Sequence, residues 1–338
     1  MRRAHRAFSM MSLTATLLAL VVVVLGAYVR LSDAGLGCPD WPGCYDRLTV
    51  PSDPQAVADA NVEYPQRPVD VAKGWKEMVH RYAAGILGLL AAALAAIAWR
   101  LRGDASRPHR LAIAILAVVT GQAILGMWTV TWNLKPLVVM AHLLGGMAVL
   151  GLLWWQTLRT QATRFRAGLL AYRRVRWSLS LALVALASQI ALGGWTSANY
   201  AALACNEFPS CKQGDLWPDA DFATGFKPWH GLGRDYEYAT HIGHDAKVAI
   251  HLVHRLGALV LTGVLLGLVA VLWRTPGRAA RRGALAVAAG LTVQLGLGVG
   301  NVVFDLPLWL AVAHNAGAAG LLLLLVTLIH LASPGLRR

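Results

Sequence analysis

The sequence has few charged residues: Asp, Glu, Lys and Arg make up 14% of its 338 residues. Soluble domains carry about a quarter. Hydrophobic residues reach 57%, and the mean hydropathy is +0.51. This composition excludes an ordinary cytosolic enzyme. It also excludes a disordered regulator, which would have fewer apolar residues and more charge. Four cysteines are too few for a disulfide-rich miniprotein.

Long apolar runs predict eight transmembrane helices. A run of about 18 or more apolar residues is long enough to cross a bilayer. The runs cover residues 10–30, 78–99, 111–132, 137–158, 178–199, 248–273, 283–304 and 309–332. Although Arg2, Arg3 and Arg6 precede the first run, no small-residue cleavage site follows it, so we expect a retained helix rather than a signal peptide. The expected fold class is an all-α integral membrane protein.

Acidic residues are almost absent from one side of the predicted membrane. Of 17 Asp and Glu residues, only Asp104 lies on the side of the N-terminus, whereas 19 of the 31 Lys and Arg residues lie there. The positive-inside rule therefore places both termini in the cytoplasm and the opposite loops in the periplasm, as in a multi-pass protein of the cell inner membrane. This topology explains the net charge of +14, and lipid rather than nucleic acid is the expected partner.

The four cysteines form two pairs with C-x5-C spacing, just after the first and fifth runs. They are Cys38 with Cys44, and Cys205 with Cys211. Disulfides persist in an oxidising space such as the periplasm, so we expect two short-loop disulfides. A reversible redox pair is an alternative, and a metal site would need tighter spacing.

The two halves of the chain repeat. Cys38 and Cys205 are 167 residues apart, His80 and His254 are 174 apart, and His142 and His314 are 172 apart. Each copy holds four runs, so both copies start on the same side of the membrane. We therefore predict two parallel four-helix bundles, residues 1–160 and 175–335, related by a pseudo-twofold axis along the membrane normal. Inverted repeats, as in many transporters, are not indicated.

Four histidines are expected inside the membrane, within about two turns of the outer helix ends. They are His80, His142, His254 and His314. Each is followed at i+3 and i+4, on the same helix face, by Gly or Ala. Such small residues allow close helix packing and could also admit a flat macrocycle. The pattern predicts two bis-His haem sites, His80 with His142 and His254 with His314. Interhelical hydrogen bonding is the plainer alternative, and zinc is disfavoured because ligand spacing is absent.

Arg81 and Arg255 directly follow two of these histidines. A cation near the outer surface could hold haem propionates through charge-assisted hydrogen bonds. The alternative is an arginine whose head group extends to the interface from a helix end.

The two copies differ in ionisable residues. Glu77 lies one turn before His80, where the other copy has His251, and Arg30 corresponds to Ser197. This asymmetry suggests that one half holds a fixed cofactor and the other performs chemistry, with Glu77 as proton acceptor or cation stabiliser. Glu77 could instead pair at the surface with a neighbouring lysine. The loop 212–247 could cover the second site or dock a partner, although a solvated loop is the default interpretation; it carries His230, His241, His244, Trp229, Tyr236 and Tyr238.

The chain resembles the heme A synthase family. The motifs that carry the resemblance are Gly35-Leu36-Gly37-Cys38-Pro39-Asp40-Trp41-Pro42, Val79-His80-Arg81, Val253-His254-Arg255, Ala141-His142 and Ala313-His314. The resemblance implies oxidation of a ring methyl of haem O, through an alcohol, to the formyl group of haem A. It also implies a heme b on His254 and His314, substrate haem O near His80 and His142, and Glu77 as a catalytic residue.

The chemistry must come from haem iron, with the protein supplying ligands and orientation. No flavin or nicotinamide fingerprint is present, so electrons must come from a donor that the sequence does not name. Haem O synthase and cytochrome oxidase assembly factors are candidate partners. The alternative functions are a diheme b-type electron-transfer cytochrome, which would not explain the asymmetry at Glu77, and a haem carrier.

Overall fold

A computed structural model describes residues 2–100, 109–161, 168–212, 214–229 and 242–333. Throughout these ranges the regular secondary structure is α-helical, and no strand is formed beyond two isolated bridges. Residues 213 and 230–241 of the long second outer loop, which include His230, Tyr236, Tyr238 and His241, lie outside the described residues, and the predicted covering or docking role of the loop stays a prediction.

The described residues form ten helices, eight of them long and apolar enough to cross a membrane, which confirms the eight predicted spans. They are α1 (Arg2–Leu31), α2 (Pro54–Glu63), α3 (Val71–Arg100), α4 (His109–Thr131), α5 (Pro136–Thr160), α6 (Arg173–Ala198), α7 (Phe222–Gly225), α8 (His244–Arg274), α9 (Arg278–Val303) and α10 (Leu308–Ala332). The short helices α2 and α7 were not predicted. Asp53 before Pro54 is a start signal that would have indicated α2, since Asp53 caps the helix through the Ala56 N–H.

Helix α3 begins seven residues before the predicted span. Asp70 accepts a hydrogen bond from the backbone N–H of Lys73 at 3.0 Å and so caps the first turn. His80 therefore lies nine residues inside α3, and His254 lies ten residues inside α8. His142 and His314 each lie six residues after their helix begins. Because α3 and α8 extend beyond the apolar runs, these numbers do not give a depth in the membrane, and the matching depth of the four histidines stays a prediction.

Two short turns reverse the chain in the same way in each half. Asn133 and Leu134 after α4, and Asp305 and Leu306 after α9, adopt left-handed backbone conformations with φ between 50° and 58°. The Leu134 N–H donates to the Thr129 carbonyl, and the Leu306 N–H donates to the Asn301 carbonyl. These bonds satisfy carbonyls that the helix ends would otherwise leave unpaired. The turns thereby make α4 and α5, and α9 and α10, antiparallel neighbours.

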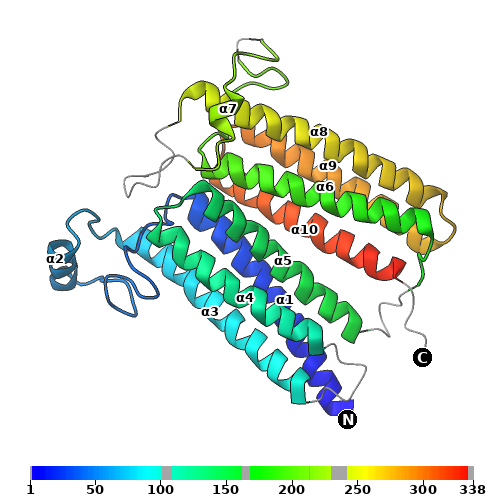
Figure 1. Cartoon of the computed structure of the whole chain (residues 1–338), viewed down its shortest axis with the longest axis horizontal. Helices are drawn as coiled ribbons and strands as arrows, with labels where there is room; N and C mark the ends of the chain where they lie inside the picture. Colours follow the sequence, from blue (N-terminus) through cyan, green and yellow to red (C-terminus); the bar gives the residue numbers. More distant parts are fainter. Residues whose placement is uncertain (1, 101–108, 162–167, 213, 230–241, 334–338) are drawn as a thin grey trace.

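The eight long helices gather by sequence half (Figure 1). In the first half α1 packs against α3 and α5, and α4 packs against the same two helices. In the second half α6 packs against α8 and α10, and α9 does likewise. The halves meet where α5 contacts α6, α1 contacts α10, and α5 contacts α10. Exchanging the two halves reproduces this set of contacts, as a pseudo-twofold relation would require.

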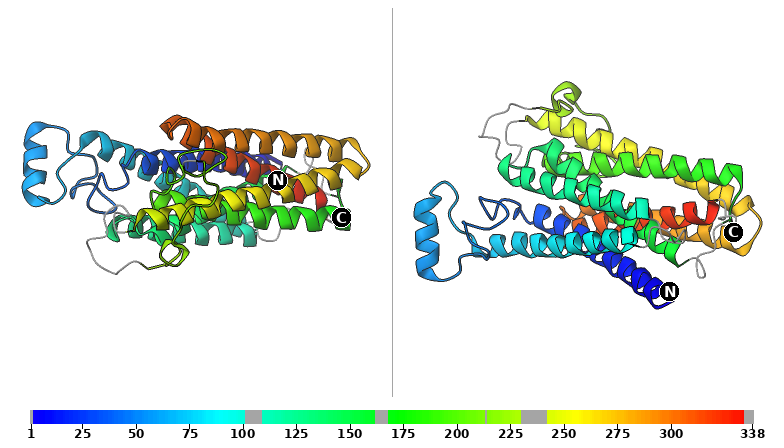
Figure 2. Two further views of the ribbon diagram at one scale, coloured as in Figure 1. Left: turned by 90° about the horizontal axis from the view of Figure 1, so that it is seen from above. Right: turned by 60° about the horizontal axis from the view of Figure 1, so that its bottom comes forward.

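The buried apolar core lies toward the end of the bundles that carries the chain termini. It includes Leu94, Leu153, Leu179, Leu268 and Leu325, each at most 2% exposed, and it continues across both halves. At the other end α2 extends beyond the long helices, and α7 lies against the first turns of α8 (Figures 1 and 2). The four histidines lie between this core and that end.

Candidate functional site: two pairs of histidines

Each histidine of the four faces a glycine on a neighbouring helix. A Cβ atom built on Gly26, Gly126, Gly193 or Gly298 would lie 3.0, 3.4, 3.3 and 3.1 Å from the ring Cε1 of His80, His142, His254 and His314 respectively. At Gly26, Gly193 and Gly298 an added Cβ would require the imidazole to shift by a few tenths of an ångström, and at Gly126 it would touch the ring. All four histidines therefore pack against a glycine in the same way. Sequence spacing alone did not indicate this regularity.

The paired histidines come from helices that lie diagonally across a bundle. His80 is on α3 and His142 on α5, and both helices pack against α1 and α4. His254 on α8 and His314 on α10 have the same relation through α6 and α9. The two histidines of each predicted pair thus lie on helices that share the same two neighbouring helices.

The histidine pairs fit a haem group in two respects. Nδ1 of His80, His142 and His314 is buried and has no hydrogen-bond partner, although buried polar atoms are normally paired. Residues 141–146 of α5 and 312–318 of α10 keep part of their surface free, although these helices are packed against other helices. Free imidazole nitrogens on helices that keep part of their surface exposed suit axial ligation of a flat iron porphyrin.

The small residues after the histidines have a different use from the one predicted. A Cβ at Gly145, Gly257 or Gly317 would collide with the side chain of Gln122, Gln189 or Gln294, respectively. Each of these glycines is at i+3 from its histidine. The interpretation that these i+3 positions leave room for a macrocycle is therefore wrong, because a glutamine from the neighbouring helix occupies the space.

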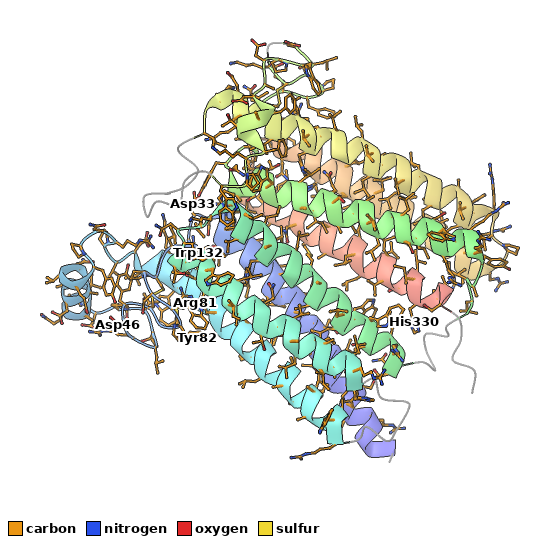
Figure 3. All side chains as sticks on the ribbon, viewed as in Figure 1. Asp33, Asp46, Arg81, Tyr82, Trp132 and His330 are labelled. Atoms are coloured by element: carbon orange, nitrogen blue, oxygen red, sulfur yellow. A yellow bond between two sulfur atoms is a disulfide. The ribbon has the colours of Figure 1, made fainter. Side chains whose placement is uncertain are left out.

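Glu77 fixes the first cysteine loop to α3. It is 4% exposed, and its Oε2 accepts from the backbone N–H of Cys38 at 3.0 Å. Its Oε1 accepts from Nη2 of Arg81 at 2.5 Å, so the expected alternative of a surface pair with lysine is wrong. Figure 3 shows Arg81 at the end of α3 beside the loop that carries Asp46.

Arg81 completes this connection. Its Nη1 donates to the carbonyl oxygens of Asp40 at 3.0 Å and Pro42 at 3.3 Å, and also to that of Gly43. Three loop carbonyls and one carboxylate therefore compete for the guanidinium. The predicted contact with haem propionates stays a prediction, and these bonds argue against it.

The second half repeats this arrangement with His251 in place of Glu77. The Cys205 N–H points at Nδ1 of His251 at 3.2 Å, and Nε of Arg255 points at its Nε2 at 3.2 Å. Arg255 also donates to the carbonyls of Cys205, Glu207, Pro209 and Ser210. A neutral imidazole has a single acceptor nitrogen, so it satisfies one of the two donors, whereas the carboxylate of Glu77 satisfies both.

Both cysteine pairs form disulfides, as predicted. Cys38 is bonded to Cys44 and Cys205 to Cys211, and all four residues are fully buried. Each bridge closes a small loop held to its transmembrane helix by an arginine. Whether either bridge exchanges with a partner thiol stays a prediction.

The two halves are joined at their outer ends by residues that correspond in the repeat. Arg30 of α1 donates to the Ser197 carbonyl at 2.5 Å and to the Tyr200 hydroxyl at 2.9 Å. The Tyr200 hydroxyl in turn donates to Asp33 at 2.9 Å. Burial, with the hydrogen bond to Asp33, raises the pKa of Tyr200 well above its ordinary value. Arg30 thus contacts its own counterpart, and Tyr200 is a functional candidate that sequence reasoning missed.

Among the residues that the structure describes, no group of three or more His, Cys, Asp or Glu side chains could hold a bare metal ion. The fold and site define a multi-pass membrane protein with two pairs of histidines of the kind that bind haem. The chain matches the family model of the cytochrome oxidase assembly protein, COX15-CtaA, over residues 9–326. It therefore belongs to this family, that of the heme A synthases.

Individual relatives agree with this assignment. The chain is 42% identical to the heme A synthase of Shewanella oneidensis over 310 residues, covering 91% of this chain and 92% of that protein. It is 26% identical to the heme A synthase of Beijerinckia indica, covering 99% and 95%. It is 29% identical to "Heme A synthase COX15" of Arabidopsis thaliana, covering 91% and 71%.

Proposed function

We propose that the protein is a heme A synthase, a membrane oxidoreductase that converts a ring methyl of haem O to the formyl group of haem A. The observation that carries the proposal is the pair of diagonal histidine sites in a chain of this family. Each site offers two imidazoles from helices that lie diagonally across a four-helix bundle.

In this proposal His254 and His314 hold a heme b, and His80 and His142 receive haem O. A bound haem iron supplies the redox chemistry. The chain's own part is to present imidazole nitrogens from α8 and α10, and from α3 and α5, and to exclude water through the apolar core beneath the sites. The bundles 1–160 and 175–335 thus serve as substrate half and cofactor half.

Glu77 gives the substrate half its distinct chemistry. It is the residue one turn before His80, and its counterpart in the other half is uncharged when His251 is neutral. The carboxylate holds Arg81 and the Cys38 N–H, so it fixes the outer boundary of the substrate site. We propose that it also stabilises positive charge or accepts a proton during oxidation of the substrate.

The orientation follows from the distribution of charge. Both termini are proposed to lie in the cytoplasm and both disulfide loops in the periplasm, with the protein in the inner membrane. An oxidising periplasm would maintain the two bridges. Electrons come from a donor outside the chain, and haem O synthase and assembly factors are the proposed neighbours that supply haem O and use haem A.

Co-expression with a haem O synthase tests the proposal. Haem extracted from the purified protein and separated by chromatography should contain b-, o- and a-type haems. A protein that holds two b haems and never yields haem A would be an electron-transfer cytochrome. His254→Ala and His314→Ala should remove the b haem, and a normal b-haem spectrum in either variant would reverse or refute the assignment of the halves.

A further inference from the structure

Glutamine side chains lie beside three of the four histidine sites, those of His142, His254 and His314. Gln122, Gln189 and Gln294 each lie four residues before the glycine that faces the histidine: Gly126, Gly193 and Gly298. Each glutamine also lies against the glycine at i+3 of its histidine. A glutamine and two glycines therefore accompany each of these imidazoles.

In the second half the glutamines are bonded to the histidines. Nε2 of Gln189 donates to the His254 carbonyl at 3.0 Å and lies 3.1 Å from Nδ1 of the same residue. Nε2 of Gln294 donates to the His314 carbonyl at 3.1 Å and lies 3.4 Å from a ring nitrogen of His314. One amide thus holds both the backbone and the ring of its histidine, which limits rotation of the imidazole.

In the first half, within the part of the chain that the structure describes, neither His142 nor His80 is hydrogen-bonded to a glutamine. Gln122 lies against Gly145, but among the described residues no hydrogen bond joins it to His142. At His80 the corresponding position on α1 is Val22, which has no amide side chain and accepts a hydrogen bond from the His80 ring through its backbone carbonyl. The i+3 residue there is Ala83, so the glycine is missing where the glutamine is missing. This correlation within one chain shows that the i+3 glycine accommodates the amide.

The amide oxygens of Gln189 and Gln294 are buried and have no partner. A histidine that binds iron through one ring nitrogen carries a proton on the other, and that N–H needs a fixed acceptor. A rotated carboxamide offers its oxygen to this N–H. The unpaired oxygens therefore have a use once iron is bound.

We propose that Gln189 and Gln294 are positioning residues that orient His254 and His314 as permanent axial ligands, and that His80, whose ring is bonded by the Val22 backbone and, among the described residues, by no glutamine side chain, is an exchangeable ligand. The inference rests on the proposed function and explains how one repeated bundle keeps its haem while the other exchanges it. Such ligand partners typically change metal affinity by about 10–100-fold.

The test measures haem release and redox potential in the full-length purified protein. The protein is loaded with haem b, and transfer to excess apomyoglobin is followed by absorbance. Gln189→Leu and Gln294→Leu should release haem from the second half about tenfold faster and shift its potential. Gln156→Leu is the matched control, because Gln156 is a fully buried membrane glutamine that bonds Ser12 and no histidine. It should leave both readouts unchanged.

A variant that adds the missing glutamine tests whether its absence makes His80 exchangeable. Val22→Gln with Ala83→Gly installs the missing pair and should slow haem release from the first half about tenfold. Ala83→Gly alone should not. If a leucine variant fails to fold, the Val22→Gln and Ala83→Gly double variant still tests the inference. Gln189→Asn is a milder replacement for Gln189→Leu in that case.

Unchanged release and potential in Gln189→Leu and Gln294→Leu would overturn the positioning role, and unchanged release in the double variant would overturn the proposal that His80 is exchangeable because it has no glutamine partner. His254→Ala separates these outcomes from failure of the proposed function. If that variant keeps its b haem, the assignment of the halves is wrong. If it loses the haem while the glutamine variants behave as wild type, the present inference alone fails.

Discussion

Glu77 and His251 occupy the same place in the two halves of the protein. Each accepts the N–H of the first cysteine of its loop, and each contacts the arginine four residues further along its helix. The carboxylate pairs with a cation, whereas the imidazole does not. The same scaffold therefore holds its loop by an ion pair in one half and by neutral hydrogen bonding in the other.

Glu77→Ala should destabilise the first half more than His251→Ala destabilises the second. Removing Glu77 leaves Arg81, whose side chain is 11% exposed, without its counterion. Breaking such a buried pair costs about 3–5 kcal/mol, against about 1–3 kcal/mol for a neutral hydrogen bond. Thermal unfolding in detergent measures the difference. Glu77→Ala should also stop haem A formation while the b haem is retained, and full activity would remove Glu77 from the mechanism.

Gly298→Ala should disturb His314. The added Cβ would lie 3.1 Å from the ring Cε1, so the imidazole must move. We expect a changed b-haem absorption spectrum and loss of haem on dialysis. Gly296→Ala in the same helix is the control, because a Cβ there meets nothing within 4 Å. It should retain the spectrum and gain about 1 kcal/mol of helix stability. Equal behaviour of the two variants would contradict the seating of His314 on Gly298.

Replacing Cys205 and Cys211 by serine should lower stability by about 2–3 kcal/mol. The bridge joins residues separated by 6 positions, and closing so short a loop removes that much chain entropy from the unfolded state. The loss of stability is measured from the unfolding temperatures of the double variant and the wild type, with and without reductant. The Cys38 and Cys44 variant should lose a similar amount and some turnover. Wild-type stability in both variants would show that the arginines hold the loops unaided.

Tyr200 should make the junction between the halves sensitive to alkaline pH. Burial raises its pKa, so the folded state favours the neutral hydroxyl. The stabilisation is therefore complete below the ordinary tyrosine pKa of about 10 and is lost as the pH rises above it. Tyr200→Phe should cost about 0.5–1.5 kcal/mol at pH 7.

The difference in unfolding temperature between Tyr200→Phe and the wild type should shrink above pH 10. A difference that stays constant from pH 7 to pH 11 would show that the hydroxyl contributes nothing through its protonated form. Tyr172→Phe is a suitable control, because this exposed tyrosine lies at the start of α6, away from the junction.

Much of the architecture could be predicted from sequence. All eight spans were found, because a helix that crosses a bilayer must be apolar over its whole length, and this property is visible in any window of the chain. The cysteine pairs were found because their spacing repeats. Helix α3 was predicted too short, since its first turns carry Lys73, Lys76 and Glu77 and extend beyond the apolar run.

The contacts of the site were harder to predict. The pairing of histidines followed from the repeat, but the glycine that each histidine faces did not. The space beside the i+3 glycines was expected to admit haem, and glutamine side chains occupy it instead. Arg81 was expected either to hold propionates or to extend to the interface, and its guanidinium is bonded to the cysteine loop. In each case the partner lies on another helix or loop.

Local composition thus decides which eight segments can cross a membrane, and it predicts which end faces the cytoplasm. These are properties of single segments, and hydrophobicity and charge fix them one segment at a time. Packing decides the rest: Gln189 reaches His254, Arg30 reaches Tyr200, and Glu77 reaches Cys38. Such pairs depend on the rotation and axial offset of one helix against another, which no pattern along a single helix specifies.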